Sequence, residues 1–230
     1  MPTQLDILFE DNHLLVVNKP PLLATMGAEP GMSSLYIEAK QYIKEKYSKP
    51  GNVYLGIVSR LDSFVSGVIV LAKTSKSAAR ISEQIRRGTV EKTYWAIVPD
   101  RLAEDAGVLE HLVYKDDGLR RMIGIDPKSA RQHPDAKIAR LAYRKIGQHQ
   151  NLAMVEVRLE TGRKHQIRVQ FSEIGCPVVG DRKYDSELGF PKGIALHSKS
   201  LKFDHPTLKS ELSFDALPPT CWNLERFGIR

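Results

Sequence analysis

The chain has 230 residues, of which 42% are hydrophobic and 27% charged, a composition typical of a globular protein with its own core. Its net charge is +7, and residues 51–200 carry 25 Lys or Arg against 17 Asp or Glu, so the basic surplus lies in the body of the protein and not in a tail. No run of 18 apolar residues and no secretory signal is visible, and two cysteines make neither a disulfide framework nor a metal motif, so we expect a cytoplasmic protein with reduced thiols.

The N-terminal segment predicts two short strands and a helix. The strands are expected at Leu5–Glu10 and Leu14–Asn18, on either side of a polar turn. Ser33 or Ser34 can cap a helix that runs to about Tyr47, where a Pro-Gly pair follows.

The next segment predicts strand, strand and helix. Tyr54–Val58 is expected to be a strand, and the continuous apolar run Gly67–Ala72 a fully buried one. Thr74 can cap a helix that ends at Gly88 after two arginines. The apolar stripe of this helix comprises Ala78, Ile81 and Ile85.

The C-terminal half is less regular. Strands are expected at Val90–Val98, Leu152–Leu159 and Ile194–Phe203, and a helix at Lys164–Ile174. Residues 103–150 are polar and rich in turn residues, and the pattern predicts little there. Irregular alternation with hairpin-like neighbours favours an α+β fold with a mixed, largely antiparallel sheet.

A first candidate for chemistry is the tripeptide Arg60-Leu61-Asp62, which lies between two predicted strands. An acid on a loop held between strands is positioned rigidly, as a catalytic group requires, and Arg60 can help to keep it ionised. From these residues alone, however, an aspartate that bonds nearby turn amides is the favoured interpretation.

A second candidate is the basic cluster at the turn from a strand into the helix after Thr161. Gly162 permits a close turn, and Lys164 and Arg168, four residues apart, would share a face of the predicted helix. With Arg163 they form a phosphate-binding candidate. A solvated basic helix start is the alternative, although basic charge there opposes the helix dipole.

A third candidate is Lys92-Thr93-Tyr94-Trp95 on a predicted strand, where Tyr94 and Trp95 face opposite sides, so at most one of them points into any one cleft. An aromatic ring there could stack on an extruded base. A core tyrosine with a satisfied hydroxyl is the commoner role. His165 and His197 belong to no metal-binding pattern, and no phosphate loop or dinucleotide-binding turn is present. Neither a metal nor ATP nor NAD is therefore implied.

Taken together, the order of these segments resembles the RluA family of RNA pseudouridine synthases. The resemblance covers about Leu5–Pro99 and Asn151–Pro218 and is poor between them. It is carried by six stretches in register: Asp11–Pro20; Arg60-Leu61-Asp62 with Ser66-Gly67 and Leu71-Ala72-Lys73; Val90–Tyr94; Thr161–Arg168; Gly175–Asp181; and Leu196-His197.

This resemblance implies a long, mostly antiparallel mixed sheet in two subdomains with a central catalytic cleft. We expect residues 1–230 to form a single catalytic domain whose two subdomains share one sheet. The separate N-terminal RNA-binding domain of some relatives is expected to be absent.

The resemblance also implies roles for individual residues. Asp62 falls on the catalytic aspartate, Tyr94 on the active-site tyrosine, Arg168 on the basic partner of the aspartate and Leu196 on an apolar residue of the uracil pocket. Arg60 is expected to help hold the target nucleotide out of its stack. The remaining expected substrate contacts are Arg163, Lys164, His165 and Gln166.

Three positions depart from the family pattern: Ser59 and Val65 around the Arg-Leu-Asp stretch, and Gln170 where a histidine is common. They leave the implied catalytic set intact and put in doubt how closely substrate binding follows other members.

The implied activity is isomerisation of specific uridines in ribosomal or transfer RNA, with Asp62 as nucleophile or as the carboxylate that starts glycosidic cleavage. The target base must leave its stack. No cofactor is expected, RNA is the expected partner, no membrane is involved, and a monomer suffices. Two alternatives remain: a nucleic-acid hydrolase or glycosylase that uses the same carboxylate, and a catalytically silent RNA-binding or RNA-folding factor.

Overall fold

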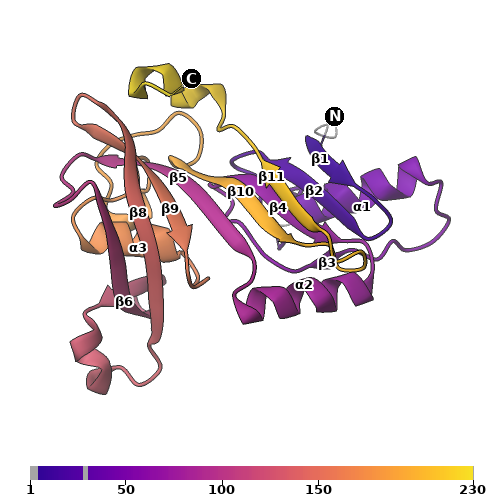
Figure 1. Ribbon diagram of the computed structural model, residues 1–230, viewed down its shortest axis with the longest axis horizontal. Coiled ribbons are helices and arrows are strands. Elements are labelled where there is room, and N and C mark those ends of the chain that lie inside the picture. The colour runs from indigo at the N-terminus through magenta and orange to yellow at the C-terminus, as the bar shows by residue number, and fades with distance from the viewer. Residues whose placement is uncertain (1–4, 28–30, 230) are drawn as a thin grey trace. The chain divides into compact units, whose positions relative to one another are not determined.

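The computed structural model describes residues 5–27 and 31–229 (Figure 1). Within them, eleven strands form a large, mostly antiparallel open sheet accompanied by three α-helices, so the predicted α+β class is confirmed. Every strand pair whose register is defined runs antiparallel. None of the described helices is long and apolar enough to cross a bilayer.

Two compact units make up the chain. The first comprises residues 1–92 and 198–219, and the second residues 93–197 and 220–230. Two strands, β5 (Glu91–Pro99) and β10 (Leu196–Asp204), contribute residues to both units.

In the first unit the strands are ordered β1-β2-β4-β10, with β3 paired to β4 and β11 to β10. Their bounds are β1 Ile7–Glu10, β2 Leu14–Lys19, β3 Gly56–Ile57, β4 Ser66–Ala72 and β11 Glu211–Asp215. The prediction of a strand over residues 54–58 was too long, because only two residues pair with β4 and Tyr54 is exposed.

Strand β4 forms the centre of this unit, and all seven of its residues are buried, as its apolar run predicted. Val68 and Val70 face a cluster that also includes Leu14 and Val16 from β2 and Ile81 from the helix α2 (Ser75–Arg87). Burying branched apolar side chains on both faces supplies the hydrophobic stabilisation of this unit.

The helices of the first unit, α1 (Leu35–Lys46) and α2 (Ser75–Arg87), begin and end where capping rules predict. The side chains of Ser34 and Thr74 accept backbone hydrogen bonds at the two N-caps. Gly88 ends α2 in the left-handed conformation, with φ of 72°.

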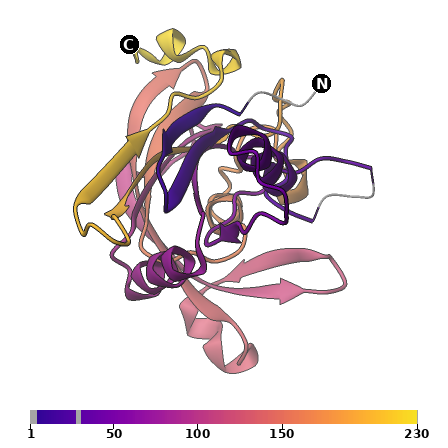
Figure 2. The ribbon, with the colours of Figure 1, turned by 90° about the vertical axis from the view of Figure 1, so that its right-hand side faces the viewer.

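In the second unit the strands are ordered β5-β9-β8-β6-β7. Their bounds, besides β5, are β6 Ala106–Asp116, β7 Arg121–Ile125, β8 Lys137–His149 and β9 Leu152–Leu159. The segment 103–150, for which the sequence predicted little, thus contains three strands and a short 3-10 turn, η1 (Pro127–Gln132), the latter drawn in pink with the β6–β7 hairpin in Figure 2.

The helix α3 (Gln166–Glu173) packs through Val169 against Val113 and Ala139 of this sheet. It begins two residues later than predicted, because His165 takes the left-handed conformation, with φ of 55°. Residues 163–165 therefore precede the helix, and Lys164 does not share a helix face with Arg168 as expected.

Candidate active site

In the first unit, Asp62 lies on the loop that joins β3 to β4. The loop closes with a hydrogen bond from the Val65 N–H to the Asp62 carbonyl, 3.1 Å long. Leu61 is buried, Asp62 is half-buried and Arg60 is exposed. The carboxylate is therefore presented from a turn whose preceding residue is anchored in the core.

The buried hydroxyl of Thr25 fixes the residue directly before Asp62. It donates to the Leu61 carbonyl at 2.8 Å and accepts from the Leu61 N–H at 3.1 Å. Both backbone polar groups of Leu61 are thus satisfied by one side chain, and losing either bond inside the protein would be costly. This clamp restricts the backbone that carries the carboxylate.

A second anchor is Lys19, a fully buried lysine at the end of β2. Its Nζ donates to the carbonyls of Pro20 and Leu23, each at 2.8 Å, and lies 3.5 Å from the carbonyl of Ser63, which follows Asp62. No role was expected for Lys19 from the sequence. Its only signal there is a lysine two residues beyond the apolar run Leu14–Val17 of β2.

The charge of Lys19 is coupled to that of Asp62. Burial lowers the pKa of Lys19 to about 7 from its ordinary 10.5, while the attraction of Asp62 opposes this shift. This attraction favours the charged form of Lys19. The structure therefore places the buried Lys19 amine within electrostatic reach of the predicted catalytic acid.

The strand that follows the loop is held by a close backbone approach at Gly67. Its φ is 116°, and a Cβ there would lie 2.3 Å from the Ser198 carbonyl oxygen. The Ser198 hydroxyl also donates to the Val68 carbonyl at 3.0 Å. Only glycine fits where β4 begins against the neighbouring strand β10.

In the second unit, Arg168 forms a buried bidentate ion pair with Asp181. The Nε–Oδ2 distance is 2.6 Å and the Nη2–Oδ1 distance 2.9 Å, and both side chains are almost fully buried. The edge of the guanidinium that carries Nε and Nη2 is thus fixed by Asp181. Arg168 is buried, whereas its place in the basic cluster predicted a surface residue that contacts phosphate. Its pairing with Asp62 stays a prediction.

Tyr184 braces the same guanidinium from one face. Its ring centroid lies 4.9 Å from the Arg168 Cζ, and its hydroxyl lies 2.7 Å from Nδ1 of His165. The hydroxyl also accepts from the Met122 N–H at 3.2 Å. Arg168 and His165 are therefore brought together through one buried tyrosine that the sequence analysis missed.

Gln166 holds the turn before α3. Its Oε1 accepts from the Thr161 hydroxyl at 2.8 Å and from the Arg163 N–H at 2.9 Å, and its Nε2 donates to the Arg140 carbonyl at 3.0 Å. Arg163 and Lys164 are exposed on this turn. Their expected contacts with substrate stay predictions.

The remaining predicted site residues also belong to the second unit. Tyr94 is half-buried on β5, opposite Val157 of β9, and Leu196 is buried at the start of β10. Gln170 is fully buried, and its Nε2 donates to the carbonyls of Leu109 and Ala139, 3.0 Å each. The departure at position 170 therefore concerns the packing of α3 on β6 and β8.

Comparison with known proteins gives the family. The RNA pseudouridylate synthase family model matches residues 13–173. The uncharacterized RNA pseudouridine synthase YhcT of Bacillus subtilis is 32% identical over 208 residues, which are 88% of this chain and 65% of YhcT. Ribosomal large subunit pseudouridine synthase D of Zymomonas mobilis is 33% identical over 94% of this chain and 69% of its own length. The chain thus spans about two thirds of these relatives.

A solved structure agrees with the sequence matches. Human RNA pseudouridylate synthase domain containing 4 superposes with a TM-score of 0.78 at 26% identity, covering 96% of this chain and 92% of the human one. The resemblance drawn from the six sequence stretches is thereby confirmed. This chain belongs to the RNA pseudouridylate synthase family and is a member of its RluA type.

Proposed function

We propose that this chain converts specific uridines of structured RNA into pseudouridine and that Asp62 is the catalytic carboxylate. The observation that carries the proposal is the double anchoring of the Asp62 loop. Thr25 holds the residue before the acid, and Lys19 contacts the residue after it and attracts the carboxylate electrostatically. Such preorganisation suits a group that must meet a reacting atom in one geometry.

The reaction is an isomerisation and needs no other reactant. The bond between N1 of uracil and C1′ of ribose breaks, the base turns, and a bond forms between C5 and C1′. The hydrogen of C5 leaves as a proton and N1 carries a proton in the product, so atoms and electrons balance. Asp62 would either attack C1′ or remove a proton from the sugar to start the cleavage.

The other site residues would act on the extruded base. Tyr94 would stack on the ring and assist loss of the C5 proton, and Leu196 would line the uracil pocket. Arg168, oriented by Asp181, would keep the Asp62 carboxylate ionised. Arg60, exposed beside the acid, would hold the target nucleotide out of its stack.

Large-subunit ribosomal RNA is the favoured substrate. The Zymomonas relative is named for that RNA, and the basic surplus of residues 51–200 suits a polyanion. Such a substrate would be met in the cytoplasm. Transfer RNA is the alternative substrate.

Mapping of pseudouridines tests the proposal. Ribosomal and transfer RNA from cells that lack this protein would be incubated with the purified chain, and pseudouridines mapped before and after. We expect new pseudouridine at discrete positions of the large-subunit RNA, unchanged chain length and no free uracil. Strand breaks or released base would indicate a hydrolase or glycosylase, and no change in either RNA would contradict the activity.

A further inference from the structure

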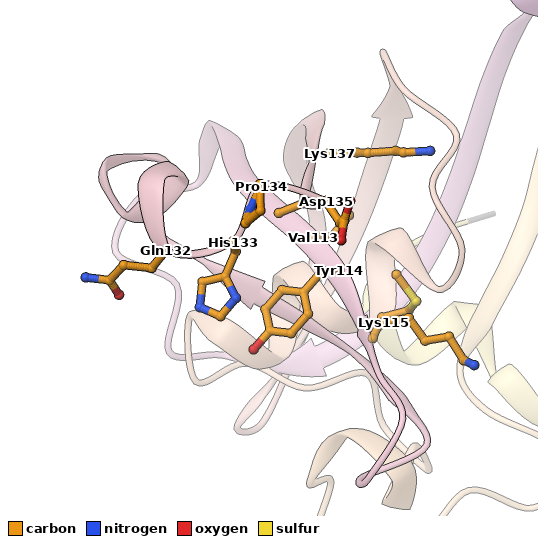
Figure 3. Close-up of a pocket in the computed structure, with 10 residues that line it drawn as sticks. Val113, Tyr114, Lys115, Gln132, His133, Pro134, Asp135 and Lys137 are labelled. Carbon is orange, nitrogen blue, oxygen red and sulfur yellow. The ribbon is translucent and has the colours of Figure 1, made fainter.

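The second unit contains a cavity of about 440 Å³ between β6, β7 and the turn that leads from η1 into β8 (Figure 3). The buried Val113 and the half-buried Met122 provide its apolar lining, and the rim carries Gln132 and Asp135. This volume lies in the range of small-ligand sites. The cavity belongs to the segment in which the family resemblance is poorest.

Two aromatic side chains form one wall of this cavity. The rings of Tyr114 and His133 stack with centroids 4.4 Å apart and planes 20° apart, and Figure 3 shows them side by side. The His133 N–H donates to the Ala130 carbonyl at 3.2 Å, and its carbonyl accepts from the Ala136 N–H at 3.0 Å. The backbone of His133 is therefore held before any ligand binds, which lowers the entropic cost of stacking a further ring on the pair.

Two lysines, Lys115 and Lys137, are among the residues that line the cavity. Lys115 pairs with Asp117 on the β6–β7 hairpin, whereas Lys137 is exposed and has no ion pair within residues 5–27 and 31–229. An aromatic platform with an apolar floor, polar rim groups and a nearby ammonium matches a nucleotide. The base can stack, its edge can bond to Gln132 or Asp135, and its phosphate can meet Lys137.

We propose that this cavity binds an unpaired nucleotide of the RNA substrate other than the uridine that is isomerised. The proposal rests on the proposed function, because that function supplies the RNA. The cavity would set which RNA is held and would leave the chemical step unchanged.

Substitution of Tyr114 tests the proposal most directly. With a short, fluorescently labelled single-stranded RNA of mixed sequence, Tyr114→Ala is expected to weaken binding roughly ten-fold to a hundred-fold, the loss typical of one stacked base. Tyr114→Trp should retain the affinity. Tyr54→Ala is the control: it removes an exposed tyrosine outside the cavity and should bind the RNA as tightly as the unaltered chain.

A second measurement remains informative if Tyr114→Ala is poorly folded. The fluorescence of Tyr114→Trp should be quenched by the RNA beyond any quenching seen with Tyr54→Trp, since only the former ring would stack on a base. Equal RNA affinities for Tyr114→Ala and Tyr54→Ala would overturn the proposal, as would equal quenching of the Tyr114→Trp and Tyr54→Trp fluorescence. The cavity would then bind a small molecule or a protein.

Turnover separates this proposal from the proposed function. On ribosomal RNA tritiated at C5 of uracil, Tyr114→Ala should raise KM and leave kcat nearly unchanged. A chain that releases no tritium but whose RNA affinity depends on Tyr114 would contradict the proposed function alone. Normal tritium release with a KM independent of Tyr114 would contradict the cavity alone.

Discussion

At the scale of single residues, the feature most specific to this site is the buried Lys19 beside Asp62. Three carbonyls surround its Nζ, one of them on the residue after the acid. A lysine is rarely buried without partners, so neither its burial nor its contact across 44 positions of sequence to Ser63 could be predicted. In contrast, Asp62 could be singled out, because Arg60-Leu61-Asp62 is one of the stretches that carry the family resemblance.

The lowered pKa of Lys19 predicts how its contribution to stability depends on pH. The folded chain releases the Lys19 proton near pH 7 and the unfolded chain near pH 10.5, so between these values the unfolded chain binds more protons and stability rises with pH. Relative to Lys19→Met, the free energy of unfolding should therefore increase from pH 7 toward pH 10, by at most about 1.4 kcal/mol per pH unit. Urea unfolding at a series of pH values measures this difference.

Lys76→Met provides the control, because Lys76 is exposed on α2. Plots of the free energy of unfolding against pH should run parallel for the unaltered chain and Lys76→Met. If the plot for Lys19→Met also ran parallel to that of the unaltered chain, Lys19 would keep its ordinary pKa in the folded chain.

At the scale of elements, α3 is the helix that orients Arg168. Asp181 and Tyr184 follow it on an irregular segment and hold the guanidinium from its edge and its face. The sequence placed Arg168 on a helix, but the partner 13 positions away lies in a loop whose path no periodicity predicts. The ion pair therefore had to be seen in the structure.

Asp181→Asn should destabilise the chain strongly, since it removes the negative charge that bonds both Nε and Nη2 of the buried Arg168. We expect a loss of about 3–5 kcal/mol in the free energy of unfolding, measured by urea. Asp185→Asn is the matched control. Its partner is Arg121, its side chain is exposed, and its loss should stay below about 1 kcal/mol. Equal losses for the two variants would mean that Arg168 does not depend on Asp181.

The elements that could be predicted have local signals. Strand β4 is an uninterrupted apolar run, and α2 lies between a capping threonine and Gly88. Strand β8 was not predicted because it has apolar residues on both faces, such as the exposed Ile138 and the buried Leu141, so apolar and polar residues do not alternate regularly along it. The β-bulge near Gly147 shifts the period further.

At the scale of the whole molecule, the basic surplus of residues 51–200 predicts salt-dependent RNA binding. The logarithm of the binding constant for single-stranded RNA should fall linearly with the logarithm of salt concentration. Lys164→Gln should lower the slope by about 0.7 if the exposed Lys164 contacts one phosphate. Lys76→Gln, which lies outside the basic cluster of residues 163–168, should leave the slope unchanged. An unchanged slope for Lys164→Gln would show that Lys164 does not contact the RNA.

The most direct test of the central claim is release of tritium from RNA labelled at C5 of uracil. The unaltered chain and Asp204→Asn, which changes an exposed acid of the same unit, are expected to release tritium in step with pseudouridine formation. Asp62→Asn is expected to bind the RNA with undiminished affinity and to release none. Release at the unaltered rate by Asp62→Asn would contradict the role given to this carboxylate.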